Sequence, residues 1–230
     1  MSAMFGLGKS KPDQAVQPKK ADGPLDNAAM HLAERLLDVG FDGKAGFEPA
    51  KKVAQDAMTK HQGNADKAIA EIIGDHRKLA AAGGFLTGLG GFVTLPIALP
   101  ANVLEFYIVA TRMTAAVASV RGYDIDQREL RSAVLLALIG ADADDLLKKA
   151  GVVSTGRLAN LAAQRLPGPA LLVVNKAVGF RLISQVGRKA FAKLGKGIPV
   201  AGGVIGAGLD VYLLNRIAGS AKKEFPPRTA

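Results

Sequence analysis

The amino-acid sequence predicts an all-α protein, built as a single helical, bundle-like domain around a central apolar, glycine-rich helical hairpin. Apolar residues recur at the 3.6-residue spacing of amphipathic helices, and the strict alternation typical of a strand is not sustained anywhere. Hydrophobic residues make up 49% of the chain, yet aromatic residues make up only 5%. The apolar mass is therefore mainly small aliphatic residues and glycine, which suit closely packed helices. A length of 230 residues fits one domain with tails.

The domain is expected to cover residues 25–225, between a flexible arm and a short tail. Residues 1–24 form the arm, because lysines and prolines are interspersed there without any apolar period. Residues 226–230 form the tail. The predicted helices cover about 26–40, 50–60, 65–76, 77–95, 101–120, 126–139, 142–149, 155–165, 170–194 and 200–217.

Cap and turn residues set the boundaries of these helices. Asp26 is the expected N-cap of the first helix, and Gly40 is its expected end. Gly63 and Asn64 separate the second helix from the third. Asp126 is the expected cap of the helix that runs to Ile139. A Pro-Gly-Pro stretch at 167–169 precedes the long basic helix.

The central hairpin is predicted from a run of 26 uncharged residues, Leu79 to Leu104. A helix needs about 20 apolar residues to cross a bilayer, so the run is long enough. Pro96 and Pro100 cannot lie inside one continuous helix, however, and they divide the run into two. Two interpretations remain open: a short hairpin that touches a membrane, or the buried centre of a soluble helical domain.

Two glycine pairs with GxxxG spacing lie in the most apolar segments. They are Gly84 with Gly88 and Gly202 with Gly206. This spacing places both glycines on one face and lets two helix backbones approach closely, in membranes and in soluble cores. We therefore expect a glycine zipper in which these four residues pack helices together.

A group of polar residues interrupts the apolar helix over 101–120. Glu105 and Arg112 are seven residues apart, so they lie two turns apart on one face, with Asn102 just before the acid. Buried charges need partners. One interpretation is a structural ion pair, in which another helix can take part. The other is a ligand-binding site in which these three residues orient a polar head group in an apolar cavity.

The positive charge is concentrated in the last third of the chain. The net charge is +10, and residues 148–230 hold 14 Lys and Arg against two acids. Five cations lie on one side of the long helix, opposite Phe180, Ile183, Ala190, Phe191 and Leu194. The cations are Arg181, Arg188, Lys189, Lys193 and Lys196. A basic amphipathic helix of this type binds anionic lipid surfaces. Nucleic acid is not expected, because recognition motifs and stacking aromatics are scarce; a solvated basic face on a packed helix is the alternative.

Neither catalysis nor metal binding is predicted. The chain has no GxSxG motif, no P-loop and no cysteine. Asp142, Asp144 and Asp145 are expected to cap the next helix, because their spacing misses the calcium-loop pattern. The three histidines fit no helical metal pair. We expect no cofactor.

Four stretches of the chain resemble the EcsC protein family. They are GGFLTGLGGFVTLPIALPANVLEFYIVATRMTAAVASVRGYD, LRSAVLLALIGADADDLLKKAG, VNKAVGFRLISQVGRKAF and KGIPVAGGVIGAGLDVYLLNRIA. The resemblance spans about residues 27–225. It implies an α-helical bacterial protein; the family is named after a product encoded beside an ABC transporter. It implies no activity and no catalytic residue.

The leading hypothesis is a membrane-associated protein, peripheral or monotopic, that engages anionic lipid without a defined reaction. No apolar region of signal-peptide length is present at the N-terminus, so we expect the protein in the cytoplasm, at the inner face of the cell membrane. The alternative is a soluble cytosolic protein that holds a lipid or other hydrophobic ligand in an apolar cavity. An enzyme acting on lipids is a weaker third option, with Glu105 as its only candidate base.

Overall fold

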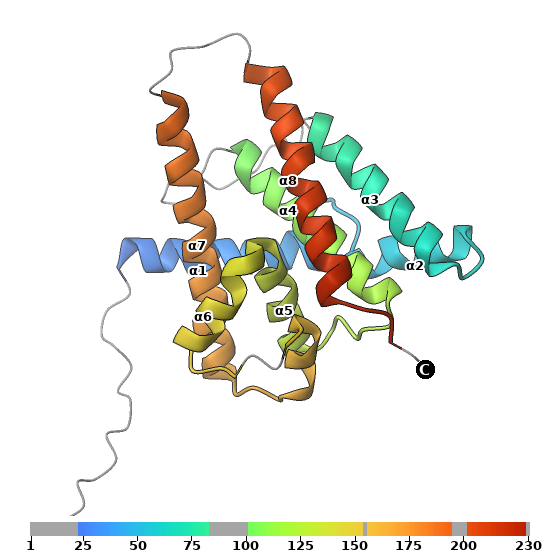
Figure 1. Ribbon diagram of the computed structural model, residues 1–230, viewed down its shortest axis with the longest axis horizontal. Helices are drawn as coiled ribbons and strands as arrows, with labels where there is room; N and C mark the ends of the chain where they lie inside the picture. Colours follow the sequence, from blue (N-terminus) through green and yellow to red (C-terminus); the bar gives the residue numbers. More distant parts are fainter. Residues whose placement is uncertain (1–22, 83–100, 154–155, 195–201, 229–230) are drawn as a thin grey trace, which may run out of the picture.

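The computed structural model describes residues 23–82, 101–153, 156–194 and 202–228, and this part of the chain is helical without any strand (Figure 1). The predicted all-α class is therefore confirmed. The α-helices are α1 (Pro24–Arg35), α2 (Ala50–Lys60), α3 (Ala65–Ala82), α4 (Ala101–Val120), α5 (Arg128–Ile139), α6 (Ala143–Lys149), α7 (Gly168–Leu194) and α8 (Gly202–Glu224). A π-helical turn, η1 (Leu36–Phe41), and two 3-10 turns, η2 (Gly140–Asp142) and η3 (Leu158–Ala163), lie between them.

Helix α4 forms the centre of the fold. Helices α2, α3, α5 and α8 and the turn η1 all pack against it. It carries only two charged residues, so nearly every face of it must be removed from water. Among the described helices, α4 alone is long and apolar enough to cross a membrane, but 89% of the stretch Val103–Val120 is buried by protein. The core helix of a soluble protein has the same properties, so α4 is weak evidence for a membrane span.

Helices α1 and α7 touch through their backbones. Ala28, Ala29 and Ala33 are buried on α1, and α7 presents Gly179 to them. A Cβ atom added at Gly179 would lie only 1.9 Å from the carbonyl oxygen of Ala29. Only glycine permits this approach, and the two helices are held close by it.

The chain after α8 is fastened to the turn between α4 and α5. Phe225 is fully buried, and its ring meets that of Tyr123 edge-on with centroids 5.6 Å apart. The Tyr123 hydroxyl donates to the carbonyl of Pro226 at 2.9 Å. The amide of Arg228 donates to the carbonyl of Arg121 at 3.2 Å. These contacts explain why α8 continues to Glu224, beyond the predicted end near 217.

Four further predicted elements differ from the structure. The N-cap of α1 is Gly23, and not Asp26, and α1 gives way at Leu36 to the π-helical turn η1. Helix α3 runs without a break through His76 to Ala82, because no proline or cap interrupts it; the rest of the predicted helix over 77–95 lies outside the described residues. The predicted helix over 155–165 is the 3-10 turn η3. Gln127, and not Asp126, is the N-cap of α5. Asp126 instead pairs with Lys51 of α2 at 2.7 Å.

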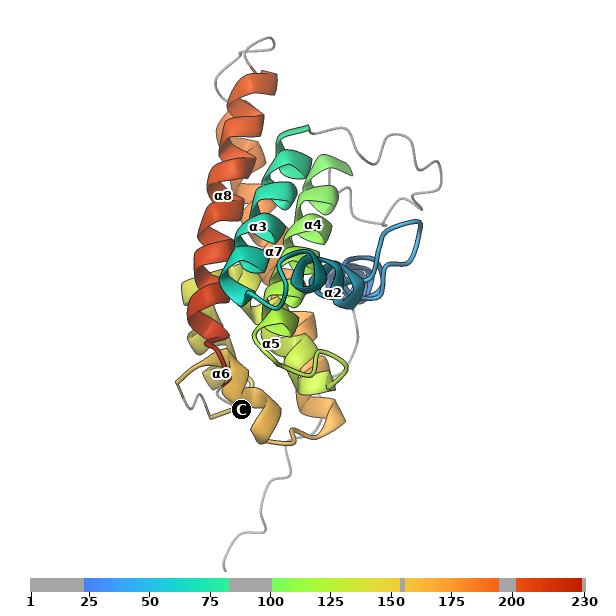
Figure 2. The same ribbon diagram turned by 90° about the vertical axis from the view of Figure 1, so that its right-hand side faces the viewer.

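The helix ends that border two undescribed stretches lie at one end of the molecule. Figure 1 shows the last turns of α3 and α7 and the first turns of α4 and α8 at the top, and Figure 2 shows the same arrangement after a quarter turn. The stretches that follow these ends in the sequence are residues 83–100 and 195–201.

We expect Gly179→Ala to destabilise the protein strongly. The new Cβ would overlap the carbonyl of Ala29, and a backbone group cannot move aside as a flexible side chain can. Helices α1 and α7 must then separate. Overpacking of this kind costs about 1–3 kcal/mol or more, so we expect a loss of about 3 kcal/mol in the free energy of unfolding, measured by urea denaturation.

Gly74→Ala in α3 is the matched control. A Cβ at Gly74 meets nothing within 4 Å. Alanine is a better helix former than glycine by about 1 kcal/mol, so this variant should be as stable as the parent or slightly more stable. Equal losses in both variants would contradict the backbone contact at Gly179.

Candidate functional site

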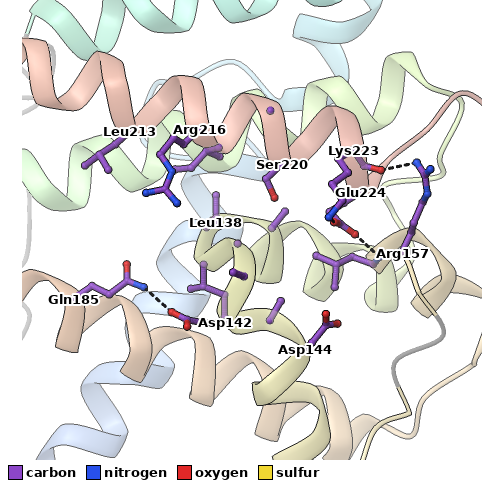
Figure 3. A pocket seen from close by; sticks show the side chains of 18 of the residues that line it. Leu138, Asp142, Asp144, Arg157, Gln185, Leu213, Arg216, Ser220, Lys223 and Glu224 are labelled. Carbon is purple, nitrogen blue, oxygen red and sulfur yellow. Dashed lines mark hydrogen bonds and ion pairs between the residues drawn. The ribbon is translucent and has the colours of Figure 1, made fainter.

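A cleft of about 790 Å³ lies between α8 and a wall formed by α4, the end of α5, η2 and the start of α6 (Figure 3). Helix α8 contributes Leu213, Arg216 and Ser220. The opposite wall contributes Leu138 and Asp142. The loop before η3, Gln185 of α7 and two aromatic residues of α4 complete the lining. The volume falls in the range of about 300–1,000 Å³ that is common for small-molecule sites.

The turn after α5 shapes the floor of this cleft. Gly140 adopts φ 61° and ψ −122°, a conformation that side-chain-bearing residues rarely take. The chain then turns through η2 and starts α6 at Ala143. Asp144 and Asp145 lie in the first turn of α6, as the sequence predicts, and Asp142 is its N-cap residue without a side-chain capping bond. The side chain of Asp142 lines the cleft instead of capping α6.

Asp142 is bound by two residues of α7. Nε and Nη2 of Arg181 donate to its Oδ2 at 2.8 and 2.6 Å, and the side-chain amide of Gln185 donates to the same oxygen at 3.4 Å. The negative charge of Asp142 is thereby compensated. Arg181, which the sequence placed on the lipid-binding face, has a structural role in this half-buried pair.

The far end of the cleft is closed by interactions around Glu224. Its Oε2 accepts the backbone N–H of Leu158 at 3.0 Å, and the ammonium group of Lys223 lies 3.7 Å from its Oε1. The guanidinium of Arg157 donates to the carbonyl of Lys223 at 2.7 Å. These contacts, two of which are drawn in Figure 3, fasten the end of α8 to the loop before η3.

Arg216 stands apart from these pairs. It is exposed, and it forms no hydrogen bond or ion pair with any residue that the structure describes. Figure 3 shows Arg216 and Ser220 pointing from α8 into the space beside Leu138 and Asp142. Four residues separate them, so they lie on one face of α8. Arg157, the other arginine of the lining, donates to the carbonyl of Lys223, so Arg216 is the guanidinium of the cleft that has no partner among the described residues, and a hydroxyl lies beside it.

Tyr107 adds an uncharged phenol to the lining. Burial raises its pKa to about 12, so the hydroxyl keeps its proton at neutral pH. Its ring packs edge-on against Phe106, with centroids 5.3 Å apart. A buried phenol of this kind can donate a hydrogen bond to a ligand but cannot act as a base near pH 7.

A second polar cluster lies outside the cleft, between α3 and α4. Nδ1 of His76 donates to the carbonyl of Ile72 at 2.7 Å, and Nε2 accepts from Nε of Arg112 at 3.1 Å. The guanidinium of Arg112 also lies over the ring of Phe47, 5.2 Å from its centroid. Burial and, second, the charge of Arg112 lower the pKa of His76 to about 4. The histidine is therefore neutral at physiological pH.

The three residues predicted to bind a ligand do not lie together in the cleft. Arg112 belongs to the cluster with His76, and Glu105 is buried on α4, but neither lines the cleft. The side chain of Asn102 lies outside the described residues. The structure thus gives Arg112 a partner on another helix, as in the structural interpretation, but that partner is a neutral histidine.

The remaining predicted site residues fall mostly outside the described part of the chain. Arg188, Lys189 and Lys193 are on α7 without described side chains, and Lys196 is not described. Gly84 and Gly88 are also not described, while Gly202 and Gly206 lie at the start of α8. The lipid-binding face and the glycine zipper remain predictions.

The buried side of α7 agrees only in part with the predicted one: Ile183 packs against the core, and the side chains of Ala190, Phe191 and Leu194 lie outside the described residues. Phe180 was expected on the apolar side, but it is 45% exposed, as are Leu172 and Val173 to similar extents. The side that faces the core carries Leu171, Val174, Val178 and Leu182. These four residues are spaced three or four positions apart, and Gly179 directly follows Val178. We infer that the contact of Gly179 with α1 sets the rotation of α7 about its axis.

Sequence reasoning missed the residues that line the cleft. Arg216 carries the only positive charge between residues 202 and 221, and a lone cation in an apolar helix is a signal that could have identified it. Tyr107 and Gln185 give no such signal, because they line the cleft only when helices that are far apart in the sequence have packed together. No group of three or more metal-binding side chains occurs within the described ranges.

We expect His76→Gln to reduce the acid sensitivity of the fold. Because the pKa of His76 is near 6.5 unfolded and about 4 folded, protonation favours the unfolded chain. The stability that the neutral form of His76 contributes is therefore fully present above pH 6.5 and is lost as the pH falls through 4. The shift corresponds to about 3 kcal/mol. Glutamine keeps an acceptor for Arg112 but does not titrate, so urea unfolding between pH 7 and 4 should show a smaller loss.

His31→Gln provides the control for this measurement. His31 is exposed on α1, 3.3 Å from Glu34, and its variant should follow the parent curve closely. Asp75, which favours the charged form of His76, is present in all three proteins. Parallel pH curves for the parent and His76→Gln would contradict a buried, neutral His76.

Comparison with known proteins gives a family but no characterised relative. No curated protein and no solved structure matches the chain. The sequence model of the EcsC protein family matches residues 50–229, from the start of α2 to beyond α8. This range covers most of the chain and every element that lines the cleft. The chain belongs to the EcsC protein family.

Proposed function

We propose that this protein is a peripheral or monotopic membrane-associated protein that engages anionic lipid at the inner face of the cell membrane. The observation that supports this most is the position of four helix ends. The ends of α3 and α7 and the starts of α4 and α8 lie at the same end of the molecule (Figures 1 and 2). We refer to this end, defined by Ala82, Ala101, Leu194 and Gly202, as the open end.

The sequences that connect these helix ends have the composition of membrane-contacting segments. Residues 83–100 contain no charged residue, and residues 195–201 contain only Lys196. Burying apolar surface in the interfacial region of a bilayer is favourable, and neighbouring cations add attraction to anionic lipid. Both apolar connections depart from the open end, so a single contact could engage both.

The charge distribution supports the same orientation. No Asp or Glu occurs between Asp145 and Asp210, and the last turns of α7 carry Arg188, Lys189 and Lys193. These turns lead to the open end. Each cation near an anionic surface contributes about 1 kcal/mol to attachment, so the three together amount to about 3 kcal/mol.

The burial of α4 favours attachment over spanning. Its apolar length is used to form the core, and moving it into a bilayer would require α2, α3, α5 and α8 to release it.

A soluble protein that holds a hydrophobic ligand is the second candidate function. The 790 Å³ cleft favours that candidate, because it places apolar side chains beside polar ones in a hollow of the protein itself.

We expect Arg188→Gln, Lys189→Gln and Lys193→Gln in combination to weaken binding to anionic vesicles. Loss of about 3 kcal/mol corresponds to roughly a hundredfold weaker partitioning. The measurement is sedimentation of the full chain with vesicles of phosphatidylglycerol and phosphatidylcholine, at low and high salt. Binding to pure phosphatidylcholine vesicles should be weak for the parent and unchanged by the substitutions.

A triple variant of Lys67, Lys148 and Lys149 to Gln is the charge-matched control. These exposed lysines lie at the start of α3 and on α6, away from the open end. The control should bind anionic vesicles nearly as well as the parent, and circular dichroism should show all three proteins folded. The proposed orientation would be refuted if the parent did not bind anionic vesicles, or if both triple variants lost the same amount of vesicle binding.

A further inference from the structure

The cleft on α8 has a chemistry that membrane attachment at the open end does not require. Its walls join a guanidinium without a partner to a set of apolar side chains from α4, α5 and α8. We propose that the cleft binds one molecule of an anionic amphiphile, whose phosphate or carboxylate head group pairs with Arg216 and whose apolar part lies against Leu213, Ile217 and Leu138. This inference does not depend on vesicle binding.

The carboxylates that line the cleft do not form an ion pair with Arg216, because each of them already has another partner. Asp142 is held by Arg181 and Gln185. Glu224 accepts the Leu158 amide and lies near Lys223. Asp144 also has an interaction partner. A ligand anion would therefore meet a positive residue and would not have to displace a carboxylate.

The surroundings of Arg216 can complete the recognition of an oxyanion. A guanidinium binds phosphate or carboxylate through two parallel hydrogen bonds. The Ser220 hydroxyl lies one turn further along the same face of α8 and points into the same space (Figure 3). The protonated phenol of Tyr107 is a further potential donor from the α4 wall.

The apolar part of the ligand is specified by the same face of α8. Leu213, Arg216, Ile217 and Ser220 follow the spacing i, i+3, i+4 and i+7, so two apolar and two polar side chains alternate along one stripe. Leu138 of α5 and Phe106 of α4 belong to the other walls of the cleft. A fully polar ligand such as a sugar phosphate would leave these side chains in contact with polar groups. An amphiphile matches both.

The size of the cleft favours one small amphiphile. A volume of about 790 Å³ is suited to a single ligand of drug-like size, such as a short-chain lipid. The residues that form it come from α4 to α8, all within the matched family region. Binding there would be saturable with one ligand per chain, which differs from partitioning onto a vesicle.

The test uses monomeric probes so that no bilayer is present. Isothermal titration of the full chain would compare dihexanoyl phosphatidic acid, dihexanoyl phosphatidylcholine, octanoate and inorganic phosphate, with every lipid below its critical micelle concentration. We expect saturable binding of phosphatidic acid with one site. Phosphatidylcholine and inorganic phosphate should each bind at least tenfold more weakly, because one lacks the net charge and the other the apolar part. The octanoate arm distinguishes a carboxylate from a phosphate head group.

Arg216→Gln should weaken phosphatidic acid binding at least tenfold. Arg216 is exposed, so the substitution should leave the unfolding curve unchanged. Lys222→Gln is the matched control, because Lys222 is an exposed cation on the same helix that does not line the cleft. Its affinity for phosphatidic acid should equal that of the parent.

Several outcomes would overturn the cleft assignment. Equal binding of the two dihexanoyl lipids would remove the role of charge, and equal binding of inorganic phosphate would remove the role of the apolar walls. Unchanged affinity in Arg216→Gln would place the ligand elsewhere. Vesicle sedimentation of the parent separates the two proposals, since a parent that binds monomeric phosphatidic acid but not vesicles would support the cleft and refute membrane attachment.

Discussion

The burial of α4 is the constraint on which the other elements depend. Its apolar faces are covered by α2, α3, α5 and α8, and three of its polar side chains, those of Thr111, Arg112 and Thr114, have hydrogen-bond partners inside the core. The hydroxyls of Thr111 and Thr114 donate to carbonyls one turn earlier, at 2.7 and 2.8 Å. Arg112 is the most demanding group, because burying a guanidinium is costly. It is accommodated by a histidine that burial keeps neutral and by the face of Phe47.

Much of the fold could be predicted because its signals are local. The predicted helices over 50–60 and 101–120 coincide with α2 and α4, since glycines, prolines and apolar spacing mark their ends. The rotation of α7 could not be predicted, because it is set by the contact between Gly179 and Ala29, which lie far apart in the sequence. The π-helical turn η1 and the 3-10 turn η3 likewise reflect packing more than local propensity.

The candidate site was less accessible to sequence reasoning than the fold. Spacing along one helix relates Glu105 to Arg112, but it carries no information about a partner such as His76 on another helix. The cleft is assembled from segments between α4 and α8, so its composition exists only after folding. Asp142 illustrates the difficulty: its position at the start of α6 was predicted, while its bond to Arg181 depends on where α7 crosses.

The long-range contacts of α8 have a consequence for synthesis of the chain. Arg77 of α3 bonds Asn215 of α8 across 138 residues, and Tyr123 bonds Pro226 across 103. Because these contacts join residues that are far apart in the sequence, the core cannot close until the C-terminal third has left the ribosome. At about 5–20 residues per second, α4 waits roughly 5–20 s for α8. During that interval the most apolar helix of the protein lacks part of its cover and is open to chaperones or to the nearest membrane.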